Sequence, residues 1–105
     1  MKYKLESGNE LEMSLADIKT ASLLLKAVKN QANFGDLISI CLNDEVLNLI
    51  LKCGEKAFYN GKRVNSIDVF ENNREDMLEV LVKIMGENIN PFSKTPLIEF
   101  PHQKD

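Results

Sequence analysis

The residues best equipped for chemistry are two cysteines and one histidine, and their spacing matches neither a redox motif nor a zinc site. Cys41 and Cys53 form no Cys-x-x-Cys unit, and the single histidine leaves too few ligands for a tetrahedral zinc site in one chain. We expect both cysteines to be buried as small hydrophobic side chains. His102 follows a proline near the end of the chain, where a catalytic base would lack rigid support.

An acidic cluster near residue 75 offers no better prospect of catalysis. Glu71, Glu75 and Asp76 lack the ligand spacing of a calcium loop, and they lie where a helix N-terminus favours negative charge. The five glycines are isolated from one another and make no phosphate-binding loop. The sequence therefore predicts a protein that is not an enzyme, with no cofactor and no metal.

Composition narrows the class of protein further. A chain of 105 residues with 44% apolar side chains fits one domain with a real core. The net charge is −3, and no basic cluster exceeds Lys62-Arg63, so we expect no nucleic-acid partner. No apolar run approaches the length of a membrane span, and the polar residues 6–10 argue against a signal peptide. We expect a cytoplasmic protein that does not bind membranes.

The first half of the chain predicts a hairpin followed by three helices. Residues 3–5 and 10–13 alternate around a Ser-Gly-Asn turn, as a β-hairpin does. Ser14 with Asp17 resembles a capping box for a helix that ends near residue 30. Asp36 can cap a short helix over 37–42, and Asn43 or Asp44 can cap the next. Its apolar positions are Val46, Leu47, Ile50, Leu51 and Cys53.

Where that third helix ends is open from the sequence alone. Gly54 is a possible stop, but residues 55–58 are good helix formers and one glycine costs only about 1 kcal/mol relative to alanine. A helix through Phe58 is therefore the alternative. Asn60-Gly61 then predicts a turn with positive φ, and residues 66–70 predict a brief helical turn.

The last helix is the most apolar stretch of the chain. We expect Asn72 or Asn73 to cap it, and Asn90-Pro91-Phe92 to end it. Its only clean polar line is Glu79, Lys83 and Glu87. A helix with so narrow a polar stripe is either a core helix or a core helix with one face against a partner, and the sequence leaves both open.

These elements predict an α+β fold that is mostly α. An N-terminal β-hairpin packs on a bundle of about four helices in one domain, residues 1–92. Residues 93–105 contain two prolines and no periodicity, which predicts an extended or disordered tail.

The order of these motifs resembles the tail assembly chaperones of long-tailed phages and prophages of Gram-positive bacteria. The resemblance covers roughly residues 4–92. Members of that family often carry a Tyr-Asn-Gly turn, a Phe-Glu-Asp-like helix entry and an Asn-Leu-x-Pro-Phe-Phe ending. Asn72 stands where the family often has Asp, and Ser93 where a second Phe is common. The matching motifs are residues 15–28 (Leu-Ala-Asp-Ile-Lys-Thr-Ala-Ser-Leu-Leu-Leu-Lys-Ala-Val), Tyr59-Asn60-Gly61, Phe70-Glu71, Arg74-Glu75-Asp76 and Asn88-Ile89-Asn90-Pro91-Phe92.

The resemblance implies a protein of the host bacterial cytoplasm that binds and solubilises the phage tape measure protein and is not retained in the virion. Further implied partners are the tail tube protein, a longer frameshifted form of this chain, and other copies of it. The alternatives are a structural head-tail or tail component and a helical DNA-binding regulator. For partner contact, the sequence-based candidates are Met77, Leu81, Ile84, Met85, Pro91, Phe92 and Phe100.

Overall fold

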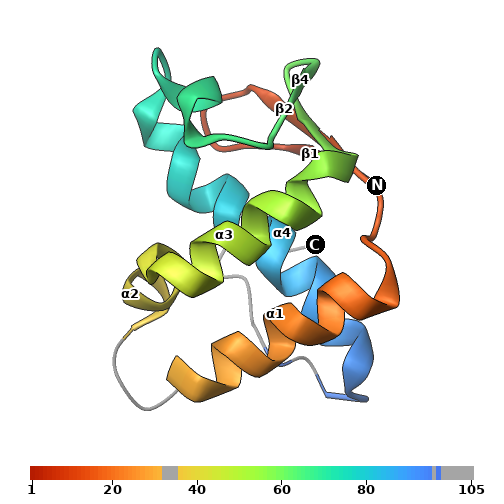
Figure 1. Ribbon diagram of the computed structural model, residues 1–105. Helices are drawn as coiled ribbons and strands as arrows, with labels where there is room; N and C mark the ends of the chain where they lie inside the picture. Colours follow the sequence, from red (N-terminus) through yellow and green to blue (C-terminus); the bar gives the residue numbers. More distant parts are fainter. Residues whose placement is uncertain (32–35, 96, 98–105) are drawn as a thin grey trace.

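The fold sets a small antiparallel sheet at one end of a group of helices (Figure 1). The computed structural model describes residues 1–31, 36–95 and 97. The strands are β1 (Lys2–Lys4), β2 (Glu10–Met13), β3 (Ala57–Tyr59) and β4 (Lys62–Arg63), and the α-helices are α1 (Ile18–Gln31), α2 (Leu37–Leu42), α3 (Asp44–Cys53) and α4 (Met77–Ile89). Short 3₁₀ turns are η1 (Gly54–Lys56), η2 (Ile67–Phe70), η3 (Arg74–Asp76) and η4 (Asn90–Phe92). The expected mostly helical α+β fold is confirmed.

The sheet contains two hairpins, of which only the first was expected in full. Its strand order is β1-β2-β3-β4, and Leu11 pairs with Tyr3 on one side and with Tyr59 on the other. Asn60 and Gly61 have φ values of 49° and 85°, which form the turn of the second hairpin. This backbone conformation is the one that an Asn-Gly pair adopts most easily in a tight hairpin.

Helix α3 ends at Cys53, so the alternative of a helix through Phe58 was wrong. The chain turns through η1, and Ala57 then pairs with Met13 in the sheet. Gly54 permits this path, because a Cβ there would lie 1.9 Å from the carbonyl oxygen of Val64. Strand pairing and this close approach outweigh the helix propensity of residues 55–58.

Two of the expected helix caps are present. Asp36 Oδ1 accepts a hydrogen bond from Ser39 N at 2.9 Å at the start of α2. Asn43 Oδ1 accepts from Glu45 N at 3.0 Å and from Val46 N at 3.2 Å at the start of α3. Both side chains satisfy backbone N–H groups that have no partner within their helix.

The other two expected caps were wrong. At α1 the cap is Asp17 rather than Ser14, because Asp17 accepts from Thr20 N at 3.1 Å and from Thr20 Oγ1 at 2.8 Å. At the last helix Asn73 makes no capping hydrogen bond with its side chain, and the turn η3 precedes α4. Asp76 occupies the cap position, but its carboxylate is bound elsewhere, as described below.

Helix α4 is the centre of the core, in contact with α1, α2 and α3. Its buried side chains include Leu81, Ile84 and Met85, each fully inaccessible to solvent. Asn88, also buried, accepts a hydrogen bond from Ala16 N and donates one to Ile84 O, both at 2.8 Å. This amide ties the chain before α1 to the last turns of α4.

The C-terminal end of the chain is described only in part. Helix α4 gives way to η4 at Asn90-Pro91-Phe92, as expected. Leu97 N donates to Asn90 Oδ1 at 2.8 Å, whereas most of the expected tail, including Phe100, lies outside the described residues. Within the described ranges, none of the helices combines the length and the apolar character that crossing a bilayer requires.

Candidate functional site

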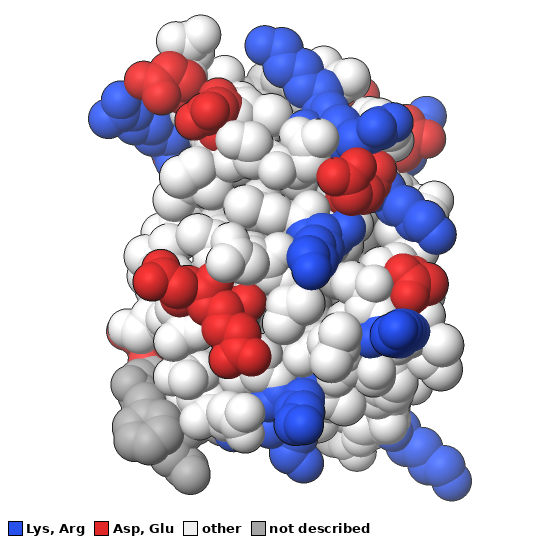
Figure 2. All heavy atoms as spheres, in the orientation of Figure 1, with Lys and Arg blue, Asp and Glu red and all other residues white. Residues whose placement is uncertain are grey.

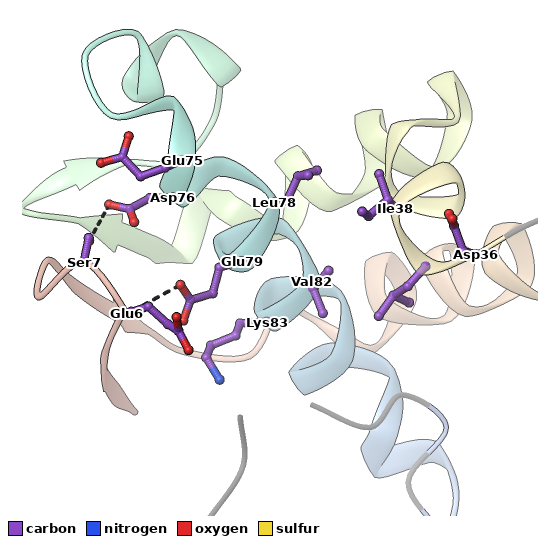
Figure 3. Close-up of a pocket in the computed structure, with 11 residues that line it drawn as sticks. Glu6, Ser7, Asp36, Ile38, Glu75, Asp76, Leu78, Glu79, Val82 and Lys83 are labelled. Atoms are coloured by element: carbon purple, nitrogen blue, oxygen red, sulfur yellow. Dashed lines mark hydrogen bonds between the residues drawn. The ribbon is translucent and has the colours of Figure 1, made fainter. Parts of the chain in front are cut away.

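A groove of about 810 Å³ runs along α4, between the β1–β2 turn on one side and the start of α2 on the other (Figure 3). We call it the α2–α4 groove. It is lined by Glu6, Ser7, Asp36, Leu37, Ile38, Glu75, Asp76, Leu78, Glu79, Val82 and Lys83.

The floor of the α2–α4 groove is apolar and partly open to solvent. Leu78 and Val82 lie one turn apart on the same face of α4 and are half-buried. Ile38 on α2 lies across from Leu78 and exposes 49% of its surface. Large apolar side chains gathered in a concave site are a common feature of binding sites.

The rim of the groove is acidic. Glu6, Asp36, Glu75 and Glu79 contribute carboxylates, and Lys83 is the single basic residue among the described residues that line it. Glu79 Oε1 accepts a hydrogen bond from the backbone N of Glu6 at 3.3 Å, which joins the β1–β2 turn to α4. The rim therefore carries an excess of negative charge around an apolar floor.

Asp76 fixes one wall of the groove. Its Oδ2 accepts hydrogen bonds from Ser7 Oγ at 2.9 Å, Asn9 Nδ2 at 2.8 Å and Tyr59 OH at 2.5 Å. Burial alone would raise the pKa of this carboxyl, yet the three donors outweigh burial and hold the pKa below its ordinary value. Asp76 exposes only 1% of its surface, so it acts as a buried anchor for the β1–β2 turn.

Tyr59 completes that anchor from strand β3. Burial and the hydrogen bond to Asp76 raise the pKa of Tyr59 to about 12, so its hydroxyl stays protonated and remains a donor. Its ring lies 5.0 Å from the ring of Phe70, centroid to centroid. The donor set thus comes from the first hairpin and from β3, far from Asp76 in sequence.

Strand β1 covers part of the polar line of α4. Tyr3 OH donates a hydrogen bond to Glu87, and Lys83 Nζ lies 4.8 Å from the centroid of the Tyr3 ring. Burial and this contact with Glu87 raise the pKa of Tyr3. The narrow polar stripe seen in the sequence is therefore largely where the first hairpin packs on α4.

The described residues offer little reactive chemistry. They contain no group of three or more histidine, cysteine, aspartate or glutamate residues that could hold a metal ion. Burial raises the pKa of the Cys41 and Cys53 thiols to about 11, which keeps both in the unreactive neutral form. The α2–α4 groove is instead suited to binding a segment in which apolar side chains are flanked by positively charged ones, because its floor is apolar and its rim is acidic.

The sequence-based candidates for partner contact fall into three groups. Leu81, Ile84 and Met85 lie in the core with 0% exposure. Met77 is half-buried in the first turn of α4. Pro91 and Phe92 are exposed at the end of α4, where Phe92 exposes 39% of its surface, and Phe100 lies outside the described residues. None of the six candidates that the structure describes lines the α2–α4 groove, and the contact of all seven with a partner stays a prediction.

The apolar groove residues that the sequence did not single out are Leu37, Ile38, Leu78 and Val82. Leu78 and Val82 belong to the same apolar helix as the core residues, so composition could not separate the two faces. Ile38 sits on a six-residue helix too short for a clear period. A usable signal was the alternation of Glu75, Leu78, Glu79 and Val82, which mixes charge and apolar side chains on one side of α4.

Comparison of the chain with protein-family models, with curated proteins and with solved structures finds no match to any of them.

Proposed function

We propose that this protein is a phage tail assembly chaperone that binds and solubilises the tape measure protein during tail tube assembly. The observation that carries the proposal is the α2–α4 groove, which presents an accessible apolar floor in a concave site. A tape measure protein is a long helical rod, and a helix that lays its apolar face into a groove is a recurring mode of recognition.

The proposal extends to the setting of that binding. The protein acts in the host bacterial cytoplasm, many copies coat one client, and tail tube protein displaces them so that the virion retains none. Repeated weak sites along one rod give avidity without any single strong contact. A longer frameshifted form of the same chain is a further proposed partner.

Co-expression with the tape measure protein tests the proposal, with solubility of the client and co-purification as the two readouts. We expect the client to be soluble and bound only when this protein is present. Ile38→Ser should lower both readouts, because it removes an apolar side chain from the groove floor. Leu23→Ser is the matched control, since Leu23 on α1 has nearly the same exposure, 48% against 49%, and lies outside the groove. A client that stays insoluble and unbound, with the short and the longer form alike, would refute the proposal.

A structural component of the head-tail connection or the tail is the first alternative. Mass spectrometry of purified particles separates the two, because the chaperone should be missing from them and a structural component present.

A DNA-binding regulator finds less support in the structure. Helices α2 and α3 follow one another with Asn43 alone between them, shorter than the usual turn of a helix-turn-helix unit. Asp44 and Glu45 occupy the first turn of α3, where phosphates would be repelled. On the face drawn in Figure 2, basic and acidic side chains are interspersed and form no continuous basic patch. We expect no shift of duplex DNA in a gel at low salt.

A further inference from the structure

We propose that the occupant of the α2–α4 groove is a single amphipathic helix of the client whose apolar stripe is flanked by lysine or arginine residues. The inference rests on the proposed function, because it specifies which segments of a client the groove accepts. It is carried by the apolar floor and the acidic rim together.

The apolar floor of the groove determines the spacing of the apolar side chains that a bound helix must present. Leu78 and Val82 stand one turn apart on α4, and Ile38 faces them from α2. Apolar side chains on both sides of a channel, with two of them one helical turn apart, match a helix that presents anchors three and four residues apart. The wall from Glu75 to Lys83 is roughly 12 Å long at 1.5 Å per helical residue, which corresponds to two or three turns of the client.

The acidic rim of the groove determines which charge is favoured on either side of the apolar stripe of the bound helix. Glu6 and Glu79 lie on the hairpin side of the floor, Asp36 lies on the α2 side, and Glu75 lies toward the start of α4. A bound helix with carboxylates beside its apolar stripe would meet like charge on both sides. Lysine or arginine at those positions would instead face opposite charge, which favours encounter and fixes orientation.

Two synthetic peptides of about 20 residues, long enough to be partly helical in water, test the inference on the full-length protein. Both carry the same leucine stripe, one with lysine and the other with glutamate on its flanks. Fluorescence anisotropy measures binding of the labelled peptides at low salt. We expect the lysine peptide to bind and the glutamate peptide to bind at least about tenfold more weakly.

Two matched pairs of variants assign binding to the groove. Ile38→Ser should weaken the lysine peptide about tenfold, because half of an isoleucine surface no longer finds an apolar contact, and Leu23→Ser should leave its affinity unchanged. Circular dichroism confirms that each variant is folded.

The second pair removes two negative charges in each variant. Glu75→Gln with Glu79→Gln should weaken the lysine peptide about threefold to tenfold at low salt, and the difference should vanish near ~0.5 M salt. Glu12→Gln with Glu45→Gln changes the net charge equally but lies outside the groove, on β2 and α3, so it should have little effect.

Three results would overturn the inference. Equal affinity for the two peptides would show that the rim does not select charge. Equal loss in the Ile38→Ser and Leu23→Ser variants would place binding elsewhere. Self-association of the protein that Ile38→Ser abolishes, without peptide binding, would make the groove an interface between copies. If the tape measure protein still co-purifies in any of these cases, the proposed function stands and only the nature of the docked segment is wrong.

Discussion

Asp76 is the side chain at which three separate segments of the chain meet. One carboxylate oxygen accepts from the β1–β2 turn through Ser7 and Asn9, and from strand β3 through Tyr59. Hydrogen bonds to an ionised group are stronger than neutral ones, and Tyr59 is a buried donor that would otherwise lose its acceptor. The wall of the α2–α4 groove therefore depends on a single buried charge.

We expect Asp76→Asn to destabilise the protein by about 2 kcal/mol, because the amide oxygen can still accept from Ser7, Asn9 and Tyr59 but carries no charge, so the three hydrogen bonds become weaker neutral ones. Urea denaturation followed by circular dichroism measures the loss. Asp68→Asn is the control, since Asp68 is exposed in η2, and it should change stability by less than about 0.5 kcal/mol. Equal stability of the two variants would show that the buried network contributes little.

The two cysteines give a second prediction at this scale. Cys41 and Cys53 are fully buried, and burial raises the pKa of each thiol to about 11. A disulfide reagent should therefore modify them at least about 100-fold more slowly in the native protein than in denaturant. Rapid reaction of either cysteine in the folded protein would contradict the packing around α2 and α3.

Among the elements, the transition from α3 to β3 depends on one glycine. The chain at Gly54 passes so close to the Val64 carbonyl that a side chain there would collide with backbone rather than with a movable group. The same contact ends the helix and lets Ala57 enter the sheet.

Gly54→Ala should therefore cost about 3 kcal/mol of stability, as overpacking against rigid neighbours does. Gly61→Ala is an informative comparison, because its φ of 85° is strained for alanine while no atom lies within 4 Å of the added Cβ. We expect the second variant to lose only about 1 kcal/mol. Thermal unfolding of both variants measures the difference, and a Gly54→Ala variant as stable as Gly61→Ala would argue against the close approach.

At the level of elements, the sequence predicted what depends on neighbours along the chain. Asp36 and Asn43 cap the helices that follow them, and Asn60-Gly61 forms its turn, because each acts within about three residues. Strand β3 was ambiguous, since its pairing partner β2 lies more than 40 residues earlier. The role of Asp76 was missed for the same reason, because local sequence favours a helix start and its donors come from distant segments.

For the molecule as a whole, the ionisable groups with shifted pKa values limit the pH range over which the folded protein is stable. The pKa of Asp76 is lower in the folded protein than its ordinary value of 3.8, so its contribution is complete above that value and lost as the pH falls further. The exposed caps Asp17 and Asp36 also have lowered pKa values, through hydrogen bonds from Thr20 and Ser39. Stability should thus fall on the acid side below about pH 4.

The alkaline side depends on the two tyrosines of the chain, Tyr3 and Tyr59. Burial raises the pKa of both, that of Tyr59 from 10.0 to about 12, so their contribution is complete below pH 10 and lost as the pH rises above it. We expect the ultraviolet absorbance of tyrosinate to appear only well above pH 10, together with unfolding. Ionisation of both tyrosines near pH 10 in a protein that remains folded would contradict this prediction.

At the scale of the whole molecule, the sequence predicted the fold class but not the α2–α4 groove. Alternating and helical patterns predicted a hairpin on a helical bundle with α4 at its centre. The α2–α4 groove arises from the angle between two helices and the position of a turn, and none of these is encoded in a local pattern. Leu81 and Val82 are neighbours in sequence, yet one is fully buried and the other lines the groove.

The order of the sheet has a consequence for aggregation. Its edge strands are β1 and β4, of three and two residues, and they carry Lys2, Lys4, Lys62 and Arg63. A strand of another copy added at either edge would bring cations beside cations along a very short ladder, which discourages edge-to-edge polymerisation. The sheet of one copy is therefore poorly suited to continue into the sheet of another copy.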